Sequence, residues 1–317
     1  MRLLYITATR VGDAVLSTGL LQHLIDRHPG LRVTVAAGRL AAPLFEAVPG
    51  LERTAAIDKR PLKLHWLDLW RTAVLHRWDL VVDLRASMIA YLLPARQRSV
   101  IGPRTHGCHR VEELAALLGL DPPPAPTVWL APRHEAAAER LIPPGGPVLA
   151  MGPAANWIGK QWRAARFAEL ARRLTGPGGA LAGARVALLA AAHERAQAEP
   201  VIGALPADRV IDLVGAVDLP TAAACIRRCR LFLGNDSGLM HLAAAAGAPT
   251  LGLFGPSPES RYRPWGPRAA YVRTPESCAE LVARGPGGGE APDTLMDGLS
   301  VSAVTAAAEA LLGRTQE

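Results

Sequence analysis

Apolar runs of strand length alternate with helical stretches along almost the whole chain, and this alternation constrains the fold more than any other feature. The runs are uninterrupted, which is typical of parallel strands that helices cover on both faces. The strands are expected at 3–8, 31–36, 54–57, 80–84, 99–102, 127–130, 148–151, 185–190, 210–213, 231–233 and 249–254. The helices are expected at 14–27, 41–48, 64–76, 111–118, 135–141, 164–174, 194–202, 221–229, 239–246 and 301–312. The pattern predicts an α/β protein with parallel sheets.

The alternation is interrupted once, near the middle of the chain. Residues 121–126 are rich in proline and cannot form a helix, and residues 143–147 are again rich in proline and glycine. A chain of 317 residues has the length of two ordinary domains. We therefore expect two Rossmann-like domains, residues 1–146 and 147–317.

The charge balance indicates the kind of partner. The net charge is +7 and the isoelectric point about 9.7, so an acidic partner is expected. No zinc-finger spacing, aromatic RNA-binding motif or basic helix is present, which argues against a nucleic acid. A phosphorylated small molecule or an anionic lipid fits better.

Four cysteines, Cys108, Cys225, Cys229 and Cys278, form no Cys-x-x-Cys pair, so no metal site is predicted and packing explains Cys225 and Cys229. This usage fits a reducing cytoplasmic compartment. We expect neither a secretory signal nor a transmembrane helix, because charged residues and glycine or proline interrupt every long apolar run.

The most informative polar segment is 234–241, which lies between an expected strand and an expected helix. At such a turn, free backbone N–H groups and the positive end of the helix dipole favour anions. Asp236 or Ser237 can cap the helix, Gly238 lets a ligand approach the backbone, and His241 follows one turn later. The alternative is a capped helix with a histidine in the core.

Two carboxylates occupy other turns that follow strands. Asp13 lies where the first strand turns into a helix, and it is either an N-cap or a base at the carboxyl edge of a sheet, where α/β folds bind ligands. Glu194 begins a helix after a strand, and it either accepts hydrogen bonds from a ribose or is a solvated residue at a helix start.

Lysine is rare in this chain, which has 32 arginines but only Lys59, Lys63 and Lys160. Because lysine is a compact point charge and arginine a planar fork, positions that keep lysine are of interest. Lys160 lies in the glycine-containing loop 152–162, where it can contact a phosphate or be a surface residue. The loop is not a P-loop, since Gln161 stands where Ser or Thr is required.

Taken together, these motifs resemble glycosyltransferase family 9, the bacterial heptosyltransferases of lipopolysaccharide core synthesis. The resemblance covers nearly the whole chain. It depends on Gly12-Asp13, on Lys160-x-Trp162 with Phe167 to Leu170, on 235–243, on Leu253 to Ser257 and on Pro264-Trp265-Gly266. Segment 236–243 combined with Phe254-Gly255-Pro256 is highly specific.

The resemblance implies the GT-B fold, in which two Rossmann-like domains with parallel sheets face each other across a cleft. It implies an inverting transfer of heptose from an ADP-sugar, without a metal or another cofactor. Asp13 would be the general base, and Lys160 would stabilise the diphosphate leaving group. The residues that would bind the donor are Asn156, Glu194, Asp236, Ser237, Gly238 and His241. Lys59, Arg60 and Lys63 would hold the acceptor, unless they form only a solvated basic loop.

The implied acceptor is an acidic glycolipid or core oligosaccharide, which suggests a cytoplasmic protein that is peripheral on the inner membrane. The chain departs from the family pattern at Arg163, where many members have proline, and at Asn156, where Ser or Thr is usual. Residues 190–193 also replace a Gly-Gly-Pro-like turn. Another nucleotide-sugar donor, a non-catalytic binding homologue and a related epimerase or nucleotide-sugar hydrolase therefore remain alternatives.

Overall fold

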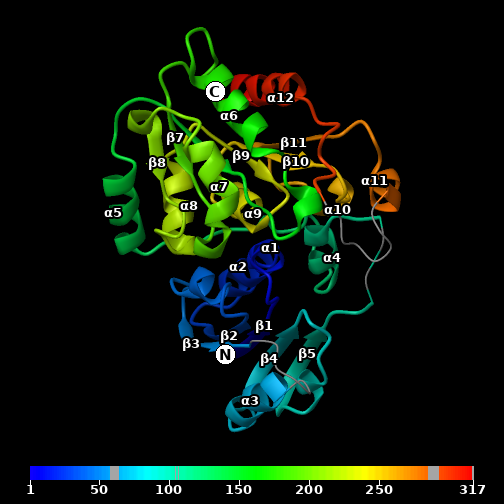
Figure 1. Ribbon diagram of the computed structural model, residues 1–317. Helices are drawn as coiled ribbons and strands as arrows, with labels where there is room; N and C mark the ends of the chain where they lie inside the picture. Colours follow the sequence, from blue (N-terminus) through cyan, green and yellow to red (C-terminus); the bar gives the residue numbers. More distant parts are fainter. Residues whose placement is uncertain (58–63, 104, 106, 285–292, 316–317) are drawn as a thin grey trace. The chain divides into compact units, whose positions relative to one another are not determined.

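The computed structural model describes residues 1–57, 64–103, 105, 107–284 and 293–315. The chain divides into two compact units, Met1–Ala131 and Pro132–Glu317, and each is built on a parallel sheet (Figure 1). Two parallel-sheet α/β units are the architecture that the alternating pattern predicts.

The division falls between the two proline-rich segments instead of at the second one. Helix α5 (Pro132–Leu141) was expected in the first domain but belongs to the second unit. It packs against α8 (Leu219–Arg227), where Arg227 donates a hydrogen bond to Glu135 over 3.0 Å. These contacts between α5 and α8 place the linker before α5.

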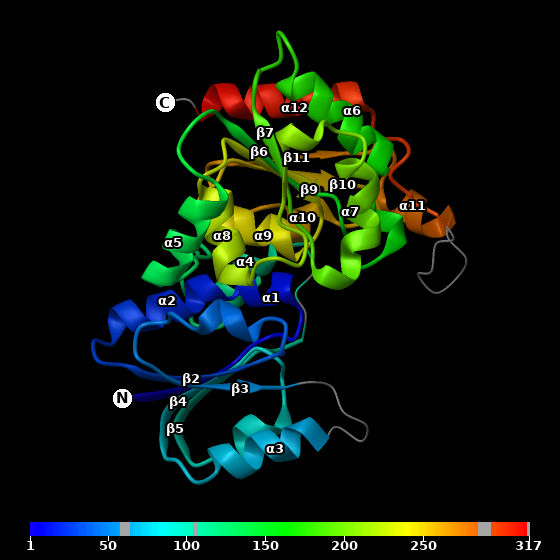
Figure 2. The same cartoon turned by 60° about the vertical axis from the view of Figure 1, so that its left-hand side comes forward.

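The first unit has a five-stranded sheet in the order β3-β2-β1-β4-β5. The strands are β1 (Arg2–Ile6), β2 (Arg32–Ala37), β3 (Leu51–Ala56), β4 (Trp78–Asp83) and β5 (Ala95–Val100). The helices are α1 (Val11–Leu16), α2 (Thr18–Arg27), α3 (Leu64–Ala73) and α4 (Arg110–Ala116), with 3₁₀ turns η1 (Ala42–Phe45) and η3 (Met88–Tyr91). In Figure 2, α2 covers one face of this sheet and α3 the other.

The single helix expected at 14–27 is instead two helices that meet at Ser17. The Tyr5 hydroxyl donates to the Ser17 carbonyl over 2.7 Å, and the Ser17 hydroxyl donates to the Ala14 carbonyl over 2.7 Å. Ser17 also shares a 2.8 Å hydrogen bond with Thr7. These buried polar groups bind the backbone where the helix would continue, so Ser17 alone separates the end of α1 from the start of α2.

The second unit has a six-stranded sheet in the order β11-β10-β9-β6-β7-β8. Its strands are β6 (Val148–Gly152), β7 (Arg185–Leu188), β8 (Val210–Asp212), β9 (Leu231–Asn235), β10 (Thr250–Phe254) and β11 (Ala269–Arg273). Its other helices are α6 (Ala164–Thr175), α7 (Arg195–Ile202), α9 (Gly238–Ala245), α10 (Glu259–Tyr262), α11 (Cys278–Arg284) and α12 (Val301–Arg314). Short 3₁₀ turns are η4 (Ile158–Lys160), η5 (Ala192–Glu194) and η6 (Ala207–Arg209). This order is that of a doubly wound dinucleotide-binding fold.

Each sheet carries a core on its faces. In the second unit, α6 and α12 lie on one face of the sheet and α8 and α9 on the other (Figures 1 and 2). Trp162 and Phe167 are almost completely buried there and meet edge to face, with ring centroids 5.1 Å apart. Since large aromatic side chains bury the most apolar area, this pair fixes the loop before α6 onto the core.

Two differences from the expected strands have physical reasons. Residues 127–130 are not a strand, because they lie against α2: the Thr127 amide donates to the Thr18 hydroxyl, and the Trp129 indole donates to Gln22. Strand β11 was not expected, because it is an edge strand with half-buried or exposed residues, and its short apolar run begins with two alanines, which have low strand propensity.

Candidate active site

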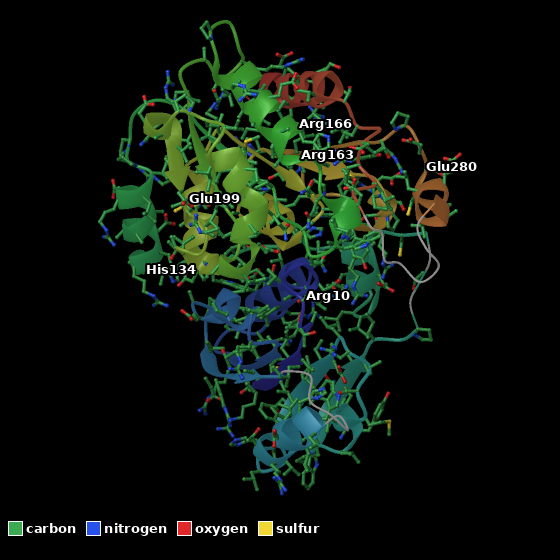
Figure 3. The ribbon with its side chains drawn as sticks, viewed as in Figure 1. Arg10, His134, Arg163, Arg166, Glu199 and Glu280 are labelled. Atoms are coloured by element: carbon green, nitrogen blue, oxygen red, sulfur yellow. The ribbon has the colours of Figure 1, made fainter. Side chains whose placement is uncertain are left out.

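The carboxyl edge of the first sheet carries Asp13. This residue lies in the first turn of α1 and is partly exposed. It is not the N-cap, as one interpretation expected, because Arg10 occupies that position in an extended conformation (Figure 3). Within the described residues, the Asp13 carboxylate makes no hydrogen bond or ion pair. It is therefore free to accept a proton or a hydrogen bond.

A buried polar network supports the helix that carries Asp13. Tyr5, Thr7 and Ser17 are all at least 99% buried and are joined by the hydrogen bonds that separate α1 from α2. Burial raises the pKa of the Tyr5 hydroxyl, so it remains a hydrogen-bond donor at every physiological pH. The short helix α1 is thus attached to the end of β1 by side chains as well as by packing.

The basic residues expected to hold the acceptor, Lys59, Arg60 and Lys63, lie outside the described residues. Their role remains a prediction.

In the second unit, β6 and β9 are neighbours, with Gly152 opposite Gly234 in the register. The loops that follow the two strands therefore leave the same edge of the sheet. Lys160 from the first loop and Asp236 from the second form an ion pair with 2.6 Å between Nζ and Oδ2. The Asp236 side chain is 6% exposed and the Lys160 side chain 25% exposed, so the pair lies just below the surface.

The Asn235 side chain connects the same two loops by hydrogen bonds. It is fully buried, its amide donates to the Pro153 carbonyl over 2.6 Å, and its side-chain oxygen accepts from the Trp162 amide over 3.1 Å. Because both ends of the amide are used, the distance between the loops is fixed by a specific pair of hydrogen bonds. Asn235 belongs to the motif at 235–243, but its sequence position alone did not indicate this role.

The start of α9 provides hydrogen-bond donors next to this pair. Ser237 occupies the N-cap position, yet no side chain caps the helix, and Gly238 is the first helical residue. The Ser237 hydroxyl is buried and has no hydrogen-bond partner within the described residues. A buried hydroxyl without a partner is unfavourable unless a ligand supplies one.

His241 lies one turn along α9 and is 5% exposed. Its Nε2 is 3.9 Å from Asp236 Oδ1, on the side of the carboxylate away from Lys160, and its ring meets Tyr262 edge to face. The structure thus brings together four of the predicted donor-site residues and Lys160: Asp236, Ser237, Gly238 and His241.

Ser257 was quoted in the motif but not selected as a site residue. It follows β10, the strand beside β9, so it lies at the same edge of the sheet. Its side chain is 3% exposed, and the hydroxyl has no hydrogen-bond partner within the described residues. The signal for Ser257 was its position directly after the Phe254-Gly255-Pro256 run.

Glu194 and Asn156 are at the same edge but are not shown to touch the ion pair. The Glu194 carboxylate accepts from the Ala191 amide over 3.0 Å, so it caps its own turn. Asn156 is exposed in the loop between β6 and η4. Their roles toward a donor remain predictions.

The loop with Lys160 is held by residues 293–299. The Leu295 amide donates to the Gly159 carbonyl over 3.0 Å, and the Trp162 indole donates to the Leu299 carbonyl over 2.9 Å. Arg163 forms ion pairs with Asp297 and Asp293 (Figure 3). Hydrogen bonds from Arg163 hold the pKa of Asp297 below its usual range. Arg163 thus fastens the start of α6 by ionic contacts.

A lysine, uncapped N–H groups and a buried hydroxyl at one helix start form a site for an anion such as a diphosphate. The described residues contain no group of three or more His, Cys, Asp or Glu side chains arranged to hold a metal ion. They also contain no helix long and apolar enough to cross a membrane.

The model of glycosyltransferase family 9 (heptosyltransferase) matches residues 68–285. The chain belongs to glycosyltransferase family 9. It is 25% identical to lipooligosaccharide heptosyltransferase 2 of Haemophilus influenzae, over 94% of this chain and 95% of that protein. It is 26% identical to lipopolysaccharide heptosyltransferase 2 of Escherichia coli, over 86% of this chain and 88% of that protein.

Two solved heptosyltransferase structures share the fold of this chain. The ADP-heptose lipopolysaccharide heptosyltransferase II of E. coli covers 100% of both chains, with a TM-score of 0.80 and 21% identity. An E. coli heptosyltransferase solved with ADP covers 98% of this chain and 100% of its own, with a TM-score of 0.72 and 19% identity. The expected GT-B fold is confirmed, and this family 9 member is a glycosyltransferase.

Proposed function

We propose that this family 9 glycosyltransferase transfers a heptose from an ADP-sugar to an acidic core oligosaccharide of the lipopolysaccharide type, with inversion and without a metal. The observation that carries the proposal is the Lys160–Asp236 pair at the uncapped start of α9. It offers a cation and backbone donors to a diphosphate, and relatives are named for lipopolysaccharide heptosyl transfer.

In the proposed reaction, the acceptor hydroxyl oxygen attacks the anomeric carbon of the heptose. Its proton passes to the Asp13 carboxylate, and the bond between the anomeric carbon and the diphosphate oxygen breaks. ADP leaves with the electron pair of that bond. A carboxylate is a weak base for an alcohol, so proton transfer occurs late, as the new bond forms.

Lys160 then stabilises the charge that develops on the diphosphate. The N–H groups at the start of α9 and the Ser237 hydroxyl add hydrogen bonds, with His241 as a further donor beside Asp236. Removal of one such preorganised donor typically lowers the rate by about a hundredfold or more. Glu194 and Asn156 are the proposed contacts to the rest of the donor, and Lys59, Arg60 and Lys63 those to the acceptor.

The proposed setting is the cytoplasmic face of a membrane that contains the acceptor. The net charge of +7 supports peripheral contact with an anionic lipid surface. The donor nucleotide is proposed from relatives that are named for ADP-heptose or were solved with ADP.

The test is a calorimetric panel of ADP, UDP, GDP and TDP with the purified protein in the presence of a chelator. We expect selective binding of ADP, followed by chelator-resistant transfer from ADP-heptose. Selective binding of another nucleotide would mean that the donor is a sugar of that nucleotide instead of an ADP-sugar. Absence of any nucleotide binding would favour a homologue without catalytic activity.

A further inference from the structure

A second polar turn lies beside Asp13 in the first unit, and the proposed function does not use it. Strand β4 pairs with β1, and its last residue, Asp83, stands opposite Ile6 in the register. The turn formed by residues 84–87 therefore leaves the same edge of the sheet as the turn that leads to Asp13. Carboxyl edges of parallel sheets are where α/β folds bind their ligands.

The turn after β4 has a fixed shape. The Asp83 carboxylate is fully buried and accepts hydrogen bonds from the backbone amides of Arg85 and Ser87, each over 2.8 Å. The Ser87 hydroxyl donates to the same carboxylate. Ala86 has a φ of +49°, in the left-handed region that non-glycine residues rarely adopt. Hydrogen bonds to one buried carboxylate hold this strained backbone in place.

Arg85 projects from this turn, and its positive charge acts through space on the nearby Asp83 carboxylate. Its Cζ lies 5.5 Å from the centroid of the Trp66 ring, so the guanidinium is placed over an aromatic face. Within the described residues, its buried Nη1 has no hydrogen-bond acceptor and the side chain forms no ion pair. The Asp83 carboxylate next to it already accepts from the turn.

Arg98, in the neighbouring strand β5, provides a comparison, because its guanidinium donates hydrogen bonds to backbone carbonyls of the same unit. Arg98 donates to the Ala90 carbonyl over 2.8 Å and to the Leu93 carbonyl over 2.6 Å. Within the part of the chain that the structure describes, Arg85 Nη1 has no such acceptor. A rigid, positioned guanidinium with a buried N–H left over matches the fork geometry of a carboxylate or phosphate.

We infer that Arg85 is a substrate-binding residue that holds an acidic group, a carboxylate or a phosphate, of the acceptor beside the Asp13 turn. The inference rests on the proposed function, because it assumes that the first unit binds the acceptor. It names a recognition contact for that acceptor: the sugar that is glycosylated, or the one next to it, carries a negative charge. The contact with the Trp66 ring, with Cζ 5.5 Å from the ring centroid, helps to position the guanidinium.

The test compares Arg85→Gln, Arg85→Lys and a matched control, Arg96→Gln. Arg96 is in the same unit, and its side chain is 84% exposed, with only a 3.8 Å contact to Asp79. Calorimetry measures binding of an O-deacylated acidic core oligosaccharide without donor, and separately of ADP. Thermal melting verifies that each variant is folded.

We expect Arg85→Gln to weaken acceptor binding by at least about tenfold, which is typical for loss of a hydrogen bond to a charged group. Arg85→Lys should be intermediate, because an ammonium ion lacks the planar fork. Arg96→Gln should stay near wild type, and ADP binding should be equal in all four proteins. Wild-type acceptor affinity in folded Arg85→Gln would overturn the inference.

Two further measurements identify the acidic group and separate this inference from the proposed function. The acidic group is identified with two modified oligosaccharides, one with its carboxylates methylated and one with its phosphates removed. The modification that eliminates the group bound by Arg85 should also eliminate the difference in affinity between wild type and Arg85→Gln. The other modification should leave that difference unchanged. In protein labelled with ¹⁵N-arginine, titration with glucuronate or inorganic phosphate should shift the Nε–H resonance that Arg85→Lys removes. No shift at Arg85 with intact ADP binding contradicts the inference alone, whereas a shift without nucleotide binding contradicts only the proposed function.

Discussion

Replacement of Lys160 by alanine should both destabilise the second unit and weaken ADP binding. The change leaves Asp236, with its side chain 6% exposed, without the cation at 2.6 Å. At an effective dielectric constant of about 20, the attraction across this distance is about 6 kcal/mol, most of which desolvation of the two ions offsets. Loss of one partner costs about 3–5 kcal/mol in a fully buried pair and about 0–1 kcal/mol at the surface. Because Lys160 is 25% exposed, we expect a loss of about 2 kcal/mol.

Calorimetric melting measures this loss, which corresponds to a fall in Tm of about 4–8 °C for a unit of this size. Asp236→Asn in the Lys160→Ala background should recover part of it, since a neutral amide needs no cation, and the cycle should show coupling of about 1–3 kcal/mol. The matched control is Arg173→Ala, because Arg173 pairs with Glu169 at the same 2.6 Å but with both side chains more than 40% exposed. This control should lose less than about 1 kcal/mol.

Calorimetric titration of ADP into Lys160→Ala tests the functional part of the argument. We expect at least about tenfold weaker binding, since a charge-assisted contact to the diphosphate is lost. Additive effects in the cycle would refute the contact between Lys160 and Asp236. Unchanged ADP affinity would refute Lys160 as a diphosphate ligand even if the stability effects are as expected.

The remaining predictions concern the proposed base, the buried thiols and the loop that carries Lys160. Asp13→Asn should abolish transfer while ADP affinity measured by calorimetry stays within about twofold, and turnover at the wild-type rate would remove Asp13 from the mechanism. Burial raises the pKa of the Cys225 thiol to about 11 and raises that of Cys229 further, so neither should react with a thiol reagent in folded protein at pH 8, whereas both should react in denaturant. Since the unfolded Cys225 thiol ionises near pH 8.5, stability should fall as the pH rises from about 8.5 toward 11, and Cys225→Ala should reduce that slope. Trp162→Phe removes the hydrogen bond from the indole to the Leu299 carbonyl and should lower the free energy of unfolding by about 1 kcal/mol. Urea titration measures this loss, and an unchanged free energy of unfolding would contradict the hydrogen bond.

The alternation of apolar runs was sufficient to predict the fold class and most of the central strands. Strands β6, β9 and β10 are buried at every position, so their sequences are continuous apolar runs that can be recognised without context. Some edge strands lack that signal: β5 has the sequence Ala-Arg-Gln-Arg-Ser-Val and was expected only from its last two residues onward. Their pairing depends on backbone hydrogen bonds to a neighbour, and side-chain patterns do not report it.

The positions of the candidate residues at the sheet edges were predictable, but their contacts were predictable only in part. Turns after β1, β6 and β9 were selected because ligands bind at carboxyl edges of parallel sheets, and all three are at such edges. The pairing of Lys160 with Asp236 joins residues 76 positions apart and follows from the β6–β9 neighbourhood, which no local pattern specifies. The break at Ser17 was missed because Tyr5 competes for its carbonyl, which is a tertiary effect.

The two units share an arrangement of polar residues at the end of one central strand. The last residue of β4 is Asp83 and the last residue of β9 is Asn235, and both are fully buried with their side chains bonded to backbone of the turns around them. Two residues beyond each, Arg85 and Ser237 carry a buried polar atom with no partner within the described residues. In each case the side chain at the strand end has its hydrogen-bond partners within the same unit, whereas the buried polar atom two residues later has none among the described residues. Because the turn is already ordered, a ligand that binds there pays little additional ordering entropy, and its hydrogen bond relieves an unfavourable buried group. This arrangement suits the proposed function, in which one sheet edge holds an anionic donor and the other an acidic acceptor.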